Sequence, residues 1–167
     1  MELLCRLERW RGPGDPLVLH VPLGDDRAAA LAEVWQRGWP DRYPLVLDAQ
    51  RPGAPFEVGD IAVETWAVRV GDPRWATGEV EPGVGMALRI AAGGLVVAVA
   101  LGAGPERAVQ RACDGADLAV VEVGVAPWPR TDAPWRIRVD QAPLLAAGAR
   151  QLWLVGDDGA PVAEGAA

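Results

Sequence analysis

Three residue types are missing from this 167-residue sequence, which contains no lysine, no serine and no asparagine. Without lysine there is no Walker-type phosphate loop and no Schiff-base catalysis, and without serine there is no serine nucleophile. Without asparagine there is no N-x-[ST] glycosylation acceptor. The polar side chains left for chemistry are arginine, carboxylates, glutamine, threonine, one tyrosine, two cysteines and one histidine.

The single histidine, His20, excludes a metal site built from several imidazoles. Cys5 and Cys113 lie far apart and form no C-x-x-C pair, so we expect two reduced thiols rather than a redox or zinc motif. A magnesium or calcium site built from carboxylates alone stays open, although no EF-hand spacing occurs. From these absences we expect neither a metal nor any other cofactor.

The charge balance is acidic, with a formal net charge of −7 and with arginine supplying all 16 basic residues. Nucleic acids and anionic membrane surfaces need a basic footprint, so neither is an expected partner. The longest uncharged run lies between Arg89 and Glu106 and is interrupted by glycines, which makes it too short for a membrane span. We expect a cytoplasmic protein, and the residue usage suggests a bacterial source.

Periodicity predicts the elements of the first half. Residues 3–10 and 17–21 alternate as strands, and the intervening glycine and proline residues favour a hairpin. Apolar residues at helical spacing predict a helix over 25–37, which Asp25 caps and Gly38 ends. Strands are expected at 45–48 and 61–70.

The second half repeats this mixture of strands and short helices. A hairpin is expected over 86–101, a helix over 105–114, a strand over 118–125 and an alternating strand over 135–139. A helical turn at 142–149 and a last strand at 152–155 follow, and Pro161 weakens any returning strand.

These elements predict an α+β fold with a mainly antiparallel sheet and two or three short helices packed on it. In two strands, 95–101 and 118–125, the residues that face either side of the strand are apolar, that is, the strands are apolar at both parities. Both faces of these strands are therefore expected to be buried, which favours a closed or half-closed barrel. A two-layer sandwich is the alternative. We expect one globular domain over 1–167, with a loose tail from about residue 157.

The candidate catalytic residues are His20, Arg89 and Glu122. Glu122 and Arg89 each interrupt an apolar strand, where an unpaired charge would be costly. One interpretation makes Glu122 a general base, with Arg89 orienting an anionic substrate. The other makes them an ion pair across the sheet, or places both on a half-solvated face. His20 is the acid–base candidate near neutral pH, or else a satisfied edge residue.

The segment Gly102–Arg107 follows a strand and opens a helix, which is the setting of a phosphate-binding turn. Arg107 replaces the third small residue of the dinucleotide fingerprint, and Pro105 removes an N–H donor. A simple strand-to-helix turn, with Arg107 touching a generic anion, is therefore expected.

Eight tryptophans are the most unusual feature of the composition. Three of them lie in loops beside proline or arginine and are candidates for a ligand platform or an interface: Trp39, Trp75 and Trp128. Alternatively, these side chains fold back over hydrophobic edges. The tryptophans in periodic segments are expected in the core.

Two functions follow from this reading. The first is a non-enzymatic module that self-associates, or binds a protein partner or small ligand, through tryptophan-bearing surface. The alternative is a small metal-independent enzyme that uses carboxylate, arginine and His20 for proton transfer or lyase-type chemistry on a small acidic substrate.

Overall fold

The computed structural model describes residues 16–23, 26–38, 44–70, 83–124, 136–156 and 160–165. Contacts within the chain divide it into two compact units, Met1–Gln50 and Arg51–Ala167. Each unit is described by itself, and one globular domain over the whole chain stays a prediction.

The first unit is a strand–helix–strand arrangement. Strand β1 (Leu17–Pro22) and strand β2 (Leu45–Gln50) pair in parallel, with Leu17 opposite Leu45. Parallel neighbours need a crossover, and helix α2 (Asp26–Gly38) supplies it. The side-chain amide of Gln36 donates to the Leu45 carbonyl at 3.2 Å and ties the helix to β2. The predicted helix and both strands are confirmed, whereas the expected hairpin partner at 3–10 lies outside the described residues.

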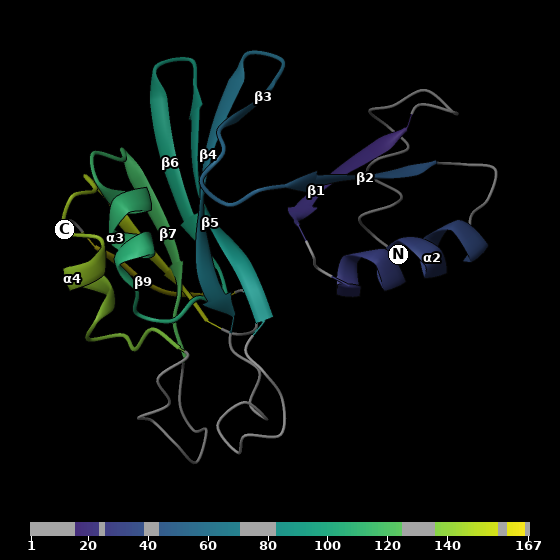
Figure 1. Ribbon diagram of the computed structural model, residues 1–167. Helices are drawn as coiled ribbons and strands as arrows, with labels where there is room; N and C mark the ends of the chain where they lie inside the picture. Colours follow the sequence, from purple (N-terminus) through teal and green to yellow (C-terminus); the bar gives the residue numbers. More distant parts are fainter. Residues whose placement is uncertain are drawn as a thin grey trace. The chain divides into compact units, whose positions relative to one another are not determined.

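The second unit contains a seven-stranded sheet in the order β3-β4-β5-β6-β7-β8-β9 (Figure 1). The strands are β3 (Phe56–Val58), β4 (Ile61–Val70), β5 (Gly83–Ala92), β6 (Leu95–Ala100), β7 (Leu118–Glu122), β8 (Leu152–Val155) and β9 (Pro161–Gly165).

The sheet is mixed and open. Strands β3 to β6 are antiparallel neighbours, β6, β7 and β8 are parallel, and β9 is antiparallel to β8. Strands β3 and β9 are the two edges, so the expected closed or half-closed barrel is wrong, and so is the mainly antiparallel character of β6–β8. Strands that are apolar at both parities also suit the buried centre of a parallel sheet, which is the form they take here.

Two short helices make the parallel crossovers and cover one face of the sheet. Helix α3 (Arg107–Cys113) contacts β4, β5 and β6, and it also contacts α4 (Ala142–Leu145) (Figure 1). The core beneath them is built from small side chains on β6 and β7, including Ala98, Ala100 and Ala119. Because these side chains are small, the helices can approach the sheet closely.

Two local predictions differ from the structure. Residues 136–139 form no strand, and Arg138 makes an isolated bridge to Gly124. Strand β9 does form and begins at Pro161, because an edge strand tolerates the missing N–H of proline. No helix among the described ranges is both long and apolar enough to cross a membrane.

Candidate functional site

The carboxyl ends of the three parallel strands form one end of the sheet. In open sheets with parallel strands, ligands bind outside such ends. The turn after β6, the residues that follow β7 and the segment that precedes α4 all reach this end of the sheet. It carries several arginines and carboxylates.

Glu122 ends β7 and holds two neighbouring segments. Its Oε1 accepts from Nη1 of Arg136 at 2.7 Å, and its Oε2 accepts from the Gly102 N–H at 3.1 Å. The Glu122 and Arg136 side chains are 21% and 27% exposed. A carboxylate this far from water requires such donors. The turn after β6 and the segment at Arg136 are therefore fixed to the end of β7 through one side chain.

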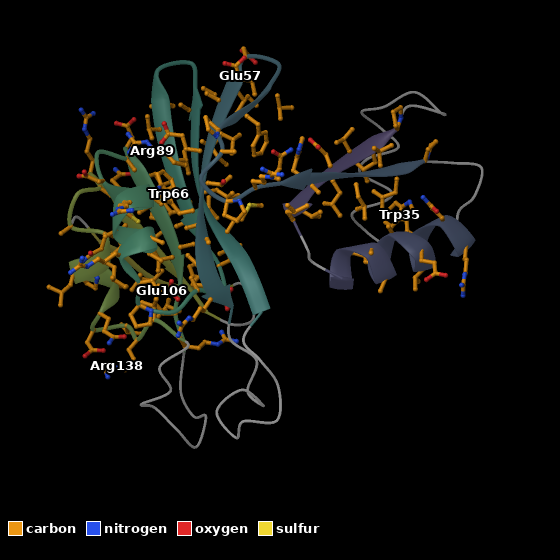
Figure 2. The ribbon with its side chains drawn as sticks, in the orientation of Figure 1. Trp35, Glu57, Trp66, Arg89, Glu106 and Arg138 are labelled. Carbon is orange, nitrogen blue, oxygen red and sulfur yellow. The ribbon has the colours of Figure 1, made fainter. Side chains whose placement is uncertain are left out.

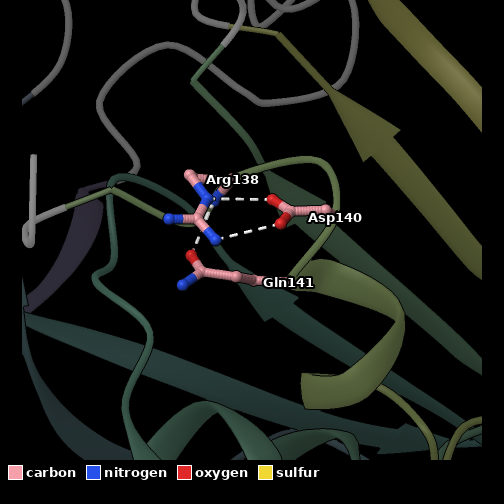
Figure 3. A network of polar contacts seen from close by, with 3 residues as sticks. All are labelled: Arg138, Asp140 and Gln141. Carbon is pink, nitrogen blue, oxygen red and sulfur yellow. Dashed lines mark hydrogen bonds and ion pairs between the residues drawn. The ribbon is translucent and has the colours of Figure 1, made fainter. Parts of the chain in front are cut away.

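The segment that follows Arg136 is held by its own contacts. The Gly124 N–H donates to the carbonyl of the fully buried Ile137 at 3.0 Å. The guanidinium of Arg138 binds both carboxylate oxygens of Asp140 at 2.9 Å, and the Arg138 N–H donates to Oε1 of Gln141 at 3.1 Å (Figure 3). The hydrogen bond from Arg138 lowers the pKa of the Asp140 carboxyl below its ordinary value.

A third contact lies between β4 and the start of α3. Oε1 of Glu106 accepts from the Arg69 N–H at 3.1 Å, and the Gly104 N–H donates to the Arg69 carbonyl at 3.2 Å. Glu106 is the residue before α3, and its side chain makes no capping hydrogen bond to that helix. It serves to join the end of β4 to the turn after β6.

Arg89 lies away from this end of the sheet (Figure 2). It is opposite Ala98 in the β5–β6 register, and its Nη1 donates to the carbonyl of Asp114, before β7 begins. Glu122 is the last residue of β7 and has the opposite parity to the core residue Val121. The expected ion pair between Arg89 and Glu122 is therefore wrong, because register and parity separate the two side chains.

The other candidates are distributed over both units. His20 lies on β1, where its Nδ1 is 2.9 Å from Oδ2 of Asp48. Arg107 is the exposed first residue of α3, which has seven residues and so offers a short dipole.

The three residues of the predicted tryptophan platform, Trp39, Trp75 and Trp128, lie outside the described residues. The tryptophans that the structure describes, Trp35, Trp66 and Trp153, come from three separate elements and form no aromatic cluster. Trp153 is exposed, which differs from the expected core position. Self-association and a protein partner stay predictions.

Sequence reasoning missed Arg136, Arg138, Asp140 and Glu106 as members of this group. The alternation of these arginines with apolar residues over 135–139 predicted a strand with one solvent-exposed face. A different signal was available, since a charged segment that follows a parallel strand is positioned at the carboxyl end of the sheet.

Comparisons with known proteins show the fold. No protein-family model and no curated protein matches the sequence. The metallo-β-lactamase fold protein YhfI from Bacillus subtilis is similar in structure, with a TM-score of 0.60 and 18% identity over 83% of this chain and 51% of that one. The short form of human tRNase Z gives 0.59 and 13% over 92% and 64%. A diphosphatase of the PhnP family gives 0.53 and 13% over 87% and 49%.

These similarities correct the first functional prediction. The non-enzymatic self-associating or binding module is contradicted, because the fold is that of proteins named as a tRNase and a diphosphatase. The chain spans about half to two thirds of the length of these three structures.

The name of this fold implies a metal centre, and the residues that the structure describes do not fit one. The whole chain has one histidine, so a metal centre built from several imidazoles cannot form. Within the described ranges, no group of three or more His, Cys, Asp or Glu side chains is placed to hold a metal ion. At the carboxyl ends of the strands, Arg136 binds the Glu122 carboxylate and Arg138 binds the Asp140 carboxylate. The positive charge of each arginine repels a metal cation. The chain thus combines a metallo-β-lactamase-like fold with arginine–carboxylate pairs at the end of its parallel strands.

Proposed function

We propose that this chain is a metal-independent enzyme, or the catalytic part of one, that acts on a small acidic substrate at the carboxyl ends of β6, β7 and β8. The observation that carries this proposal is the Glu122–Arg136 pair. It places a carboxylate and a guanidinium 2.7 Å apart, about three-quarters buried, where open sheets bind ligands.

Each of these two side chains has its own role in the proposed reaction. The guanidinium of Arg136 offers a planar fork of donors that matches a phosphate or carboxylate group of the substrate. The Glu122 carboxylate accepts a proton, since each of its oxygens has more than one lone pair and a hydrogen-bonded carboxylate can still act as a base. The Gly102 N–H and Arg136 hold that carboxylate in one orientation.

The first substrate class to test is a phosphate ester. The similar proteins named a tRNase and a diphosphatase both act on phosphate compounds, and an arginine fork suits a phosphate. In this reaction Glu122 takes a proton from water as the water oxygen bonds to phosphorus. The bond from phosphorus to the leaving oxygen then breaks, and the leaving group departs with the electron pair.

The experiment measures release of 4-nitrophenolate from 4-nitrophenyl phosphate and bis(4-nitrophenyl) phosphate, with EDTA present throughout. Turnover in EDTA is expected, and Glu122→Gln is expected to lower it by about 100-fold or more, as for loss of a general base. Glu57→Gln, an exposed carboxylate on β3, is the matched control and should keep the full rate. Failure of either ester to react, or an unchanged rate in Glu122→Gln, would contradict the proposal.

A further inference from the structure

The Glu122–Arg136 pair lies on the face of the sheet that is opposite to helix α3. Along β7, Ala119 and Val121 are fully buried in the core with the helices, whereas Glu122 has the other parity and points to the second face. Gly124 shares the parity of Glu122, and a Cβ atom there would lie 3.7 Å from Cβ and Cδ of Arg136. A ligand of the pair is therefore expected on this second face.

The strand register places apolar side chains beside Glu122 on the second face. Val155 of β8 is the direct partner of Glu122, and Trp153 is the partner of Val120, two residues earlier. Paired residues of neighbouring strands share a face, and so do residues i and i+2 of one strand. Strand spacing and rise put the Cα atoms of Glu122 and Trp153 about 8 Å apart. One small ligand can contact both side chains over this distance.

Trp153 is unusually exposed for a residue of an inner strand. Strand β8 is paired on both sides, with β7 and β9, yet Trp153 is 47% exposed. Its neighbours Leu152 and Leu154 face the core and are buried. Tryptophan is highly buried on average, and an exposed indole ring is a favourable surface for another aromatic ring. The sheet thus presents an aromatic surface beside the proposed reactive centre.

A second exposed apolar side chain lies on the β6 side of Glu122. Leu101 directly precedes Gly102, whose N–H donates to the Glu122 carboxylate, and it is 51% exposed. Its parity is that of Val99, which is opposite Val120 in the β6–β7 register, so it belongs to the second face. The charged pair therefore lies between two exposed apolar side chains, which suits a ligand with one anionic and one apolar part.

We propose that the substrate at this site is a phosphate ester that carries an aromatic ring, and that Trp153 is the surface on which this ring stacks. The inference rests on the proposed function, because it assigns the organic part of the same phosphate ester. Stacking depends on a planar ring, so Trp153 distinguishes an aromatic ester from an alkyl ester. It is a residue that determines specificity and takes no part in the proton transfer assigned to Glu122.

The test compares two non-hydrolysable anions that differ in the organic group alone, phenylphosphonate and methylphosphonate. Isothermal titration calorimetry with the full chain measures the Kd of each. Phenylphosphonate is expected to bind about tenfold more tightly, and Trp153→Ala should remove this preference without changing the Kd of methylphosphonate. Trp153→Phe keeps an aromatic ring and should keep most of the preference. Leu95→Ala is the matched control, since Leu95 is exposed on the same face at the far end of β6, and it should change neither Kd.

A measurement on the unmodified protein decides the question even where Trp153→Ala fails to fold. The indole N–H signal of Trp153 in the NMR spectrum is assigned by its loss in Trp153→Phe. Phenylphosphonate should shift this signal, and methylphosphonate should leave it in place. A signal that does not move with phenylphosphonate would overturn the proposal, as would equal Kd values for the two phosphonates.

Turnover separates this inference from the reaction on which it rests. Binding of phenylphosphonate that depends on Trp153, without hydrolysis of 4-nitrophenyl phosphate, would contradict the reaction and support the aromatic surface. Hydrolysis of 4-nitrophenyl phosphate together with an unchanged phenylphosphonate preference in folded Trp153→Ala would support the reaction and overturn the aromatic surface. Absence of binding by both phosphonates would overturn it as well.

Discussion

Glu122 and Arg136, fourteen residues apart in the sequence, form an ion pair whose Oε1 and Nη1 atoms are 2.7 Å apart. The same carboxylate accepts the Gly102 N–H at 3.1 Å, so one side chain joins the ends of β6 and β7 to the segment before α4. The pair thus connects three segments of the fold and is also the proposed reactive centre. Stability measurements test the first role, and activity measurements test the second.

Removing one partner of this pair should destabilise the fold. We expect Arg136→Gln to lower the free energy of unfolding by about 1–3 kcal/mol, because Glu122 then keeps a largely buried charge without its partner. Urea denaturation followed by circular dichroism measures this. Arg37→Gln removes an exposed helical pair with Glu33 and should cost less than about 0.5 kcal/mol. Equal losses in the two variants would argue against a structural role for Arg136.

Gly148 should tolerate no side chain. A Cβ atom at this position would lie 2.7 Å from Oδ1 and 2.9 Å from Cα of Asp114, so the backbone itself would have to move. We expect Gly148→Ala to cost about 1–3 kcal/mol in thermal or urea unfolding. Gly38 has no neighbouring atom within 4 Å of such a Cβ, and Gly38→Ala should change the stability by less than about 0.5 kcal/mol. A neutral Gly148→Ala would mean that the turn before β8 is looser than described.

Cys113 should be protected from alkylation in the folded protein. Its side chain is buried, and burial raises the pKa of the thiol to about 11 from 9.0. In a Cys5→Ala background, iodoacetamide at pH 8 should modify Cys113 only after unfolding in urea. Rapid modification without denaturant would contradict this expectation.

The same pKa difference predicts a loss of stability at high pH. The unfolded thiol ionises near pH 9 while the folded thiol stays neutral to about pH 11, so the contribution is complete below pH 9 and falls as the pH rises through this window. The loss should approach about 2 kcal/mol at pH 11. Cys113→Ala should remove this pH dependence when urea unfolding is measured between pH 8 and pH 11.

The Arg138–Asp140 contact should be visible in a carboxyl titration. The bidentate hydrogen bond from Arg138 holds the pKa of Asp140 below its ordinary value, and both side chains are exposed. In Arg138→Gln the carboxyl carbon of Asp140, followed by NMR, should titrate at higher pH than in the unmodified protein. Added salt should move the unmodified protein in the same direction, because screening weakens exposed pairs. An identical titration in the two proteins would show that the contact is not populated in solution.

The sequence by itself determined the local helices and strands, and it excluded several kinds of chemistry. Helix α2 and strands β1 and β4 follow from apolar spacing that acts over a few residues, so periodicity was enough to predict them. One histidine in the whole chain already excluded a centre of several imidazoles, whatever the fold.

Only the tertiary structure decided the strand order and the partners of the charged residues. Strands β6 and β7 carry apolar residues on both faces. Such strands occur both in a barrel and in the buried centre of a parallel sheet, so the sequence left both architectures possible. The partner of Glu122 depends on which strand ends meet, and that is set by crossovers through α3 and α4 rather than by nearby residues. Parity fixes the face of a side chain, but pairing across long sequence separations fixes its neighbours.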